Sequence, residues 1–180
     1  SSAVVNEKHQ TRTQAPGRLL DLAGLAAVLA PRGYASKEVL ATYQKMYEAQ
    51  VVSYPRTEDK TVTPEQFNEL LPLVDRIADL VGVDKSLLTH RQPRPTHVKA
   101  QGAHGANRPG TNVPADVQSL KKYGDSAMAI YEVLAKNYLA MLAEDYVYDH
   151  VTAELQDYPN FKTAFNLPIK LNFKLVYDSY

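Results

Sequence analysis

One short stretch of the chain places a tyrosine, an arginine and a hydroxyl side chain side by side: Tyr54-Pro55-Arg56-Thr57-Glu58. A phenol is a weak nucleophile at its ordinary pKa of about 10. It can attack a phosphodiester when nearby cations stabilise the phenolate and the charge that develops on the phosphate. Arginine suits that task because its permanently charged fork matches phosphate oxygens. Taken alone, a tyrosine in such a place is more commonly a packing residue.

A second stretch, Gly102 to Gly110, carries a histidine and an arginine four residues apart. His104 could donate to a phosphate oxygen or move a proton, and Arg108 could hold a nucleic-acid strand. The ordinary alternative is a loop histidine satisfied by backbone groups, followed by a solvated arginine.

The segment from Lys85 to Ala115 contains no Asp or Glu, although the whole chain has 20 acidic and 20 basic residues. Its prolines and glycines predict an irregular loop, and loops of this length are usually functional or disordered. The segment is therefore either a solvated, flexible loop or an anion-facing surface that a phosphate backbone occupies. Its cations are Lys85, Arg91, Arg94, Lys99 and Arg108, and its histidines are His90, His97 and His104.

Composition excludes several classes of protein. A formal net charge of zero excludes a uniformly basic nucleic-acid coat, and the absence of cysteine excludes disulfides and a thiol nucleophile. No apolar run is long enough to span a membrane, and the polar start does not resemble a signal peptide. We therefore expect a soluble, cytoplasmic protein.

Helical periodicity predicts the elements that hold these stretches in place. Helices are expected over residues 21–29, 36–50, 63–81 and 125–141, and Asp21, Ser36 and Thr63 are the predicted N-caps. Thr63 and Gln66 form a capping-box pattern with Pro64 between them. A short strand is expected at residues 51–54, where Pro55 ends it.

The two ends of the chain predict β structure. An extended arm is expected at residues 1–17, and a strand over residues 147–155. Apolar residues at every second position from Phe165 to Tyr177 predict a further strand. Helices followed by strands indicate an α+β fold.

The two chemistry-bearing stretches together resemble the tyrosine-bearing domain of the type IA DNA topoisomerases. Tyr54-Pro55-Arg56-Thr57-Glu58 matches that family's nucleophile signature, and Ala103-His104-Gly105-Ala106-Asn107-Arg108-Pro109 matches most of its second signature. The departures are Gly105, often polar or acidic in the family, and Asn107, usually Ile, and we expect them to affect packing more than chemistry. Upstream, residues 16–25 and 33–48 resemble motifs of the topoisomerase III branch.

The resemblance implies a mostly helical, winged-helix-like domain with flanking antiparallel strands from a hinge domain. We expect residues 1–17 to be an arm of the hinge domain and residues 18–143 to be the active-site tyrosine domain. Residues 85–115 would be its DNA-facing loop, and residues 144–180 would be hinge strands.

The resemblance also implies the chemistry. Tyr54 would attack single-stranded DNA and form a 5′-phosphotyrosyl link that later reseals after strand passage, without ATP. Arg56 would stabilise the phosphate and His104 would assist. The expected DNA-binding residues are Arg108, Lys99, Arg94, Arg91 and Thr57, whose hydroxyl is equally suited to capping a turn.

The family also uses a magnesium-binding acidic cluster in a separate domain, and no such run exists in this chain. Glu58-Asp59 and Glu144-Asp145 are interpreted as solvated surface pairs. We therefore expect no metal site here, Mg²⁺ in a domain missing from the chain, a monomer, and a fragment that is inactive alone.

Two other classes remain open. One is a winged-helix DNA-binding module without chemistry, whose helix at residues 36–50 enters a groove. The other is a protein-interaction domain whose acid-free segment binds an acidic partner.

Overall fold

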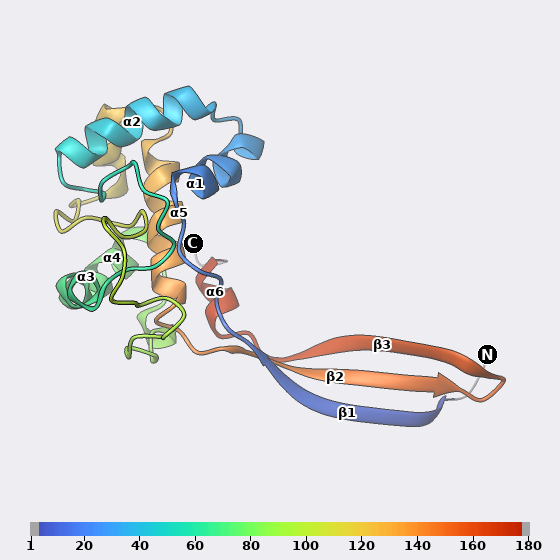
Figure 1. The fold of residues 1–180 in the computed structure, drawn as a ribbon. Coiled ribbons are helices and arrows are strands. Elements are labelled where there is room, and N and C mark those ends of the chain that lie inside the picture. The colour runs from blue at the N-terminus through green and yellow to red at the C-terminus, as the bar shows by residue number, and fades with distance from the viewer. Residues whose placement is uncertain (1–3, 178–180) are drawn as a thin grey trace.

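The computed structural model describes residues 4–177 as a helical body from which a long sheet projects (Figure 1). The predicted α+β class is confirmed. Residues 1–3 and 178–180, within the predicted terminal arms, lie outside the described residues. The helices are α1 (Leu22–Leu29), α2 (Ser36–Glu48), α3 (Pro64–Leu70), α4 (Val74–Val81), α5 (Ala127–Ala140) and α6 (Phe173–Tyr177). The strands are β1 (Val4–Gln14), β2 (Tyr146–Leu155) and β3 (Tyr158–Lys170).

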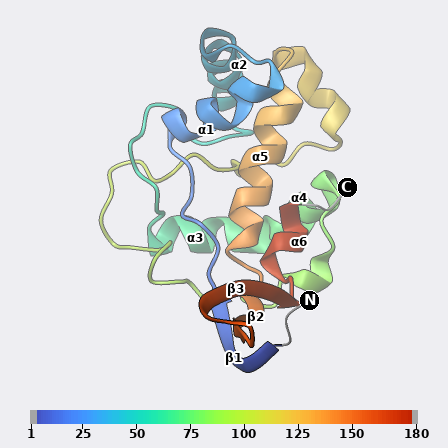
Figure 2. The same ribbon diagram turned by 90° about the vertical axis from the view of Figure 1, so that its right-hand side faces the viewer.

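Helix α5 runs through the middle of the helical body, and α1, α2, α4 and α6 pack around it (Figure 2). It is apolar on nearly every side, and its buried residues include Ile130, Leu134 and Tyr138. A helix that is apolar all round must be buried, so α5 forms the centre of the core. The other elements are arranged on its surface.

The predicted helices are all present, with one interruption. The pattern over residues 63–81 is divided into α3 and α4 by a 3₁₀ turn at Leu71–Leu73. Pro72 lies in this turn, and its missing N–H together with its ring prevents a continuous α-helix. The apolar stripe continues across the break, with Phe67, Leu70 and Ile77 buried.

Two of the three predicted N-caps are confirmed. The Asp21 carboxylate accepts from the Gly24 N–H at 2.8 Å. Thr63 and Gln66 form the predicted capping box, in which the Thr63 hydroxyl accepts from the Gln66 N–H. The prediction for Ser36 was wrong, because the N-cap of α2 is Ala35 and no side chain caps this end.

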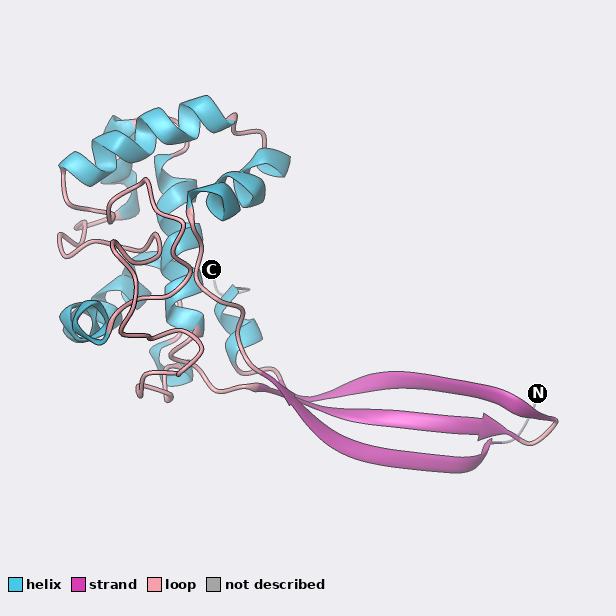
Figure 3. Ribbon diagram, in the orientation of Figure 1, coloured by secondary structure: helices cyan, strands magenta, loops and turns pink. Residues whose placement is uncertain are grey.

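The three strands form one antiparallel sheet in the order β1-β2-β3. The pair Gln14 and Tyr146 lies at the end of the sheet next to the helical body. The predicted arm and the predicted strand over residues 147–155 are therefore hydrogen-bonded neighbours, although most of the chain separates them. The chain leaves the sheet after Gln14 and re-enters it at Tyr146, with most of the helices and loops in between (Figure 3).

The prediction of a strand from Phe165 to Tyr177 is wrong in its second half. Strand β3 ends at Lys170, the chain turns at Asn172 with a φ of 48°, and α6 follows. Phe173 and Val176 are buried in the core that contains α5. Their burial in the helical body overrides the alternating pattern. The end of the chain therefore belongs partly to the helical body.

The segment of residues 85–115 is irregular, as predicted, but it is not a free loop. Apart from a 3₁₀ turn at Lys85–Leu87, single β-bridges hold it to other parts of the chain: Val98 to Val62, Asn107 to Leu20 and Pro109 to Val52. The expected strand at residues 51–54 is reduced to the last of these bridges. These bridges bring the tyrosine stretch and the histidine stretch together.

Candidate active site

Tyr54 is half-buried and lies between two other rings. Its ring centroid is 4.6 Å from that of His104, with the planes tilted by 32°, and 5.6 Å from that of Tyr47, with the planes nearly perpendicular. The two predicted chemical stretches thus meet through their central side chains. Tyr47 comes from the last turn of α2, inside the helix predicted at residues 36–50, and its contact with Tyr54 was not predicted.

The position of His104 is fixed through its main chain. The Asp59 carboxylate accepts from the N–H of His104 at 3.1 Å and from the N–H of Gly105 at 2.9 Å. The His104 carbonyl accepts from the side chains of Gln66 at 3.2 Å and Arg108 at 3.3 Å. Because both sides of the peptide are held, the exposed imidazole projects from an anchored loop.

Asp59 is therefore not the solvated surface residue that the sequence suggested. The hydrogen bonds from the His104 and Gly105 amides lower the pKa of Asp59 below its ordinary value. The bonds favour the charged form of the carboxylate. No feature of the sequence predicted this role, since an Asp two residues after Thr57 looks the same whether it faces water or a neighbouring loop.

Gly105 has a structural requirement that the sequence comparison did not indicate. Its φ is +75°, and an added Cβ would lie 2.3 Å from the Gln66 side-chain oxygen and 2.8 Å from Arg108 Nη1. Glycine is favoured in this conformation because it lacks a Cβ. The close approach of Gln66 and Arg108 to the His104 carbonyl depends on it.

Asn107 is a buried residue that contacts the main chain of the tyrosine stretch. It is 2% exposed, and its side-chain amide donates to the Tyr43 hydroxyl at 2.7 Å. The same amide nitrogen lies 3.4 Å from the Tyr54 carbonyl and 3.3 Å from the Pro55 carbonyl. Isoleucine at this position could make none of these bonds, so this departure affects the support of the candidate site as well as packing.

Arg56 and Thr57 differ in how they are engaged. Arg56 is exposed, and within residues 4–177 it has no hydrogen bond or ion pair. Its guanidinium is thus free to bind a ligand, and Arg56 follows Tyr54 by two residues in the chain. The Thr57 hydroxyl accepts from the Asp59 N–H at 3.0 Å, which is the turn-capping alternative for this residue.

The cations of the segment of residues 85–115 do not form one surface. Lys99 is exposed, whereas Arg91 donates to Asp75 at 2.6 Å. Arg94 is only 8% exposed and donates to Asp145 at 2.7 Å and to the carbonyls of Met141 and Ala143. Arg94, which was predicted to bind DNA, is therefore bonded inside the protein instead. There it connects the end of α5 to the start of β2.

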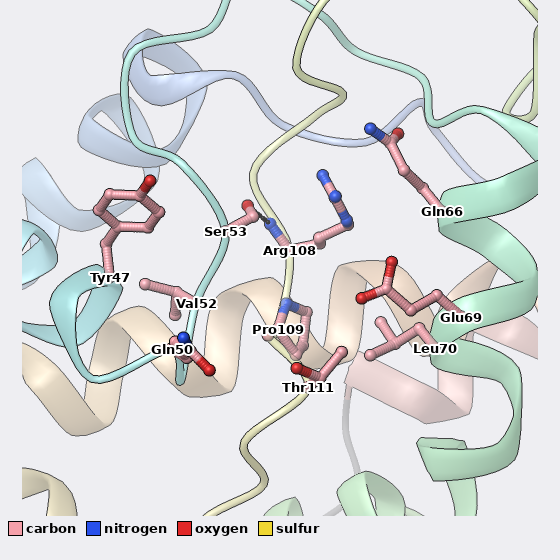
Figure 4. A pocket seen from close by; sticks show the side chains of 11 residues that line it. Tyr47, Gln50, Val52, Ser53, Gln66, Glu69, Leu70, Arg108, Pro109 and Thr111 are labelled. Atoms are coloured by element: carbon pink, nitrogen blue, oxygen red, sulfur yellow. Dashed lines mark hydrogen bonds between the residues drawn. The ribbon is translucent and has the colours of Figure 1, made fainter.

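Arg108 is half-buried, binds carbonyls of the histidine stretch and lines a pocket. Its guanidinium binds the carbonyls of His104 and Ala106, and burial lowers its pKa from the ordinary value. It also lines a pocket of about 520 Å³ between the end of α2 and α3 (Figure 4). Tyr47 and Glu69 lie on opposite walls of this pocket in the close-up view, with Arg108 between them (Figure 4).

Within residues 4–177 there is no group of three His, Cys, Asp or Glu side chains that could hold a metal ion. Asp59 is engaged with backbone amides, and Asp145 with Arg94. The described residues therefore do not fit a magnesium site. In the same part of the chain, no helix is long and apolar enough to cross a membrane.

The chain as a whole, residues 1–180, matches the family model described as DNA topoisomerase, and it belongs to that family. It is 26% identical over 155 residues to DNA topoisomerase 3 of Staphylococcus epidermidis, covering 79% of this chain and 20% of the relative. It is 30% identical over 133 residues to DNA topoisomerase 1 of Rickettsia conorii, covering 68% of this chain and 16% of the relative.

Among solved structures, full-length topoisomerase I from Thermotoga maritima has a similar fold, with a TM-score of 0.66 and 20% identity. The similarity covers 99% of this chain and 30% of that one. The chain thus spans a fifth or less of the two curated relatives. These relatives carry the names of both topoisomerase 1 and topoisomerase 3, and they confirm the predicted type IA family without selecting a branch.

Proposed function

We propose that this chain supplies the nucleophile of a type IA DNA topoisomerase, and that Tyr54 is that nucleophile. The phenolic oxygen of Tyr54 attacks a phosphodiester, and a tyrosine–phosphorus bond forms as the bond from phosphorus to the 3′-oxygen breaks. The phenol loses its proton, and the released 3′-oxygen takes one up. The reverse reaction reseals the strand, so no ATP is consumed.

The observation that supports this proposal most directly is the packing of the Tyr54 ring against His104. Arg56, two residues after Tyr54 in the chain, has no partner of its own within residues 4–177. Arg56 would bind the non-bridging phosphate oxygens as negative charge develops on them. An N–H of the His104 imidazole would donate to the same phosphate. The Asp59 carboxylate and the side chains of Gln66 and Arg108 fix the main chain of His104 before substrate binds.

Several finer features belong to the same proposal. We propose a topoisomerase III-like enzyme that prefers single-stranded DNA, acts in the cytoplasm and is a monomer, with a winged-helix-like arrangement around Tyr54. Residues 4–14 and 146–170 would belong to a hinge domain. Mg²⁺, which would neutralise phosphate charge, would be held elsewhere in the enzyme, so this chain alone is not expected to relax DNA.

A DNA-binding module without chemistry is less well supported. It would use α2 as the groove helix, but that helix carries as many acidic as basic side chains, Glu38 and Glu48 against Lys37 and Lys45. The Glu38 side chain accepts from the Thr42 hydroxyl at 2.7 Å and from the Ser126 N–H at 3.3 Å.

The test uses the full-length enzyme from the parent gene and an end-labelled single-stranded oligonucleotide. Tyr54→Phe should abolish the covalent complex while DNA affinity is retained, because only the hydroxyl is removed. Arg56→Ala and His104→Ala should each raise the activation free energy of cleavage by about 2–4 kcal/mol. Tyr34→Phe and Tyr123→Phe are the matched controls and should keep full activity. Label on any other residue, or label that persists in Tyr54→Phe, would refute the proposal.

A further inference from the structure

A shallow hollow of about 690 Å³ lies on the surface next to the candidate active site. Most of the residues that line it have no role in the proposed reaction. Three exposed cations line it: Arg18, Lys60 and Lys99. Of these, only Lys99 was predicted to bind DNA. The rest of the lining is formed by Glu58, Asp59, Thr61, Gln101 and Gly102.

The three cations come from segments far apart in the sequence, and main-chain hydrogen bonds hold these segments together. The Leu19 N–H donates to the Lys60 carbonyl at 3.1 Å, and the Lys99 N–H donates to the Val62 carbonyl at 2.8 Å. The buried ring of His97 is 2.8 Å from the Gly17 carbonyl through its Nε2. Lys60 and Lys99 make main-chain hydrogen bonds themselves, and Arg18 lies between two residues that do. The fold therefore brings the three cations together.

The charges of this hollow are not balanced inside the protein. Within residues 4–177, none of Arg18, Lys60 and Lys99 has an ion-pair partner. Of the two carboxylates, Asp59 is already engaged by the amides of His104 and Gly105. Glu58 is exposed and opposes an anionic ligand. The amides do not cancel the charge of Asp59, so three unpaired cations face two carboxylates, and the remaining net charge of +1 favours an anion.

The hollow is continuous with the histidine stretch. Asp59 lines the hollow and binds the His104 amide, and Gly102, two residues before His104, also lines it. An added Cβ on Gly102 would lie 3.2 Å from Asp59, so glycine lets the loop lie closely on this wall. A strand bound at Tyr54 and His104 would therefore reach these cations within a few nucleotides.

We propose that Arg18, Lys60 and Lys99 form a binding site for backbone phosphates of single-stranded DNA, on the His104 side of Tyr54. The site rests on the proposed function, because it places the strand that Tyr54 would cleave. Cations spaced around an open hollow contact phosphates without reading bases, so the site holds and orients the strand irrespective of its sequence. It takes no part in the chemical step.

The test measures binding of this chain to a fluorescent single-stranded oligonucleotide as a function of salt concentration. For single strands, the slope of log affinity against log salt is about 0.7 for each phosphate contact. The double variant R18Q/K60Q should lower the magnitude of the slope by about 1.4, and the further change K99Q should lower it by about 0.7 more. E58Q should strengthen binding.

The matched control is K121Q/K122Q, which removes the same charge from two exposed lysines in the 3₁₀ segment Val117–Tyr123. It should leave the slope unchanged. Equal loss in the two double variants, or an unchanged slope in R18Q/K60Q/K99Q with wild-type folding, overturns the site while leaving the proposed function standing. No binding to single-stranded DNA by the wild-type chain under any salt condition contradicts both.

Discussion

Replacing Asp59 with asparagine is the sharpest probe of how the candidate site is held. The Asp59 carboxylate accepts from the N–H groups of His104 and Gly105 at 3.1 and 2.9 Å. Asparagine has nearly the same shape but removes the negative charge. The substitution therefore weakens both bonds while leaving the packing around residue 59 in place.

The expected size of the effect follows from the strength of such bonds. A hydrogen bond to a charged group contributes about 1.5–3 kcal/mol, and a neutral one about 1 kcal/mol. Because the site is partly exposed, we expect the two weakened bonds to cost about 1–2 kcal/mol together. This corresponds to a roughly 5- to 30-fold increase in the population of the open loop.

Amide hydrogen exchange measured by NMR reports this opening directly. Exchange at His104 and Gly105 should accelerate by about 5- to 30-fold in Asp59→Asn, whereas the amides of α5 should be unaffected. The matched control is Asp79→Asn, which removes an exposed carboxylate paired with Lys85 and should leave the loop unchanged.

The effect has a defined pH dependence. The pKa of Asp59 is lowered in the folded protein, so its stabilising contribution is fully present above its unfolded value of about 3.9. That contribution is lost as the pH falls through the folded pKa, where wild type and variant should converge. Unchanged exchange at His104 and Gly105 near neutral pH, or acceleration spread equally over α5, would refute the reasoning.

Two further predictions concern stability. Arg94→Met should lower the free energy of unfolding in urea by about 2–4 kcal/mol, because Asp145 and the carbonyls of Met141 and Ala143 lose their donor. Arg91→Met, at an exposed ion pair, should cost less than about 1 kcal/mol, and equal losses would contradict an interior role for Arg94. Burial lowers the pKa of His97, so the unfolded chain binds the extra proton first, and stability should fall as the pH drops below about 6.5. His97→Gln should remove this part of the pH dependence, and an identical profile in the variant would show that another group causes it.

The helical elements were predictable because their signals are local. Apolar spacing placed α1, α2, α3 with α4, and α5, and the Thr63-Gln66 capping box was predicted from residue types alone. The meeting of Tyr54 with His104 had a different source. Their spacing along the chain does not imply contact, and the resemblance of two short motifs to one family suggested it.

What could not be predicted depends on contacts between distant residues. Counting charges in the segment of residues 85–115 could not distinguish buried Arg94 from exposed Lys99. The pattern from Phe165 to Tyr177 fits a strand, but Asn172 turns the chain and α5 offers Phe173 and Val176 a core to enter. Asp59 gains its role from a loop more than forty residues away, and that pairing leaves no periodic trace.

The pairing of Gln14 with Tyr146 has a mechanical consequence. The chain leaves the sheet after Gln14 and returns at Tyr146, so the helical body is inserted between two neighbouring strands whose inner ends touch. Tension that pulls the outer ends of β1 and β2 apart acts on the pair Val4 and Leu155 first and opens the strands one pair at a time. The helices carry no load until the last pair has opened. Force applied at the far end of the sheet therefore separates the paired strands before it reaches the tyrosine-bearing helical body.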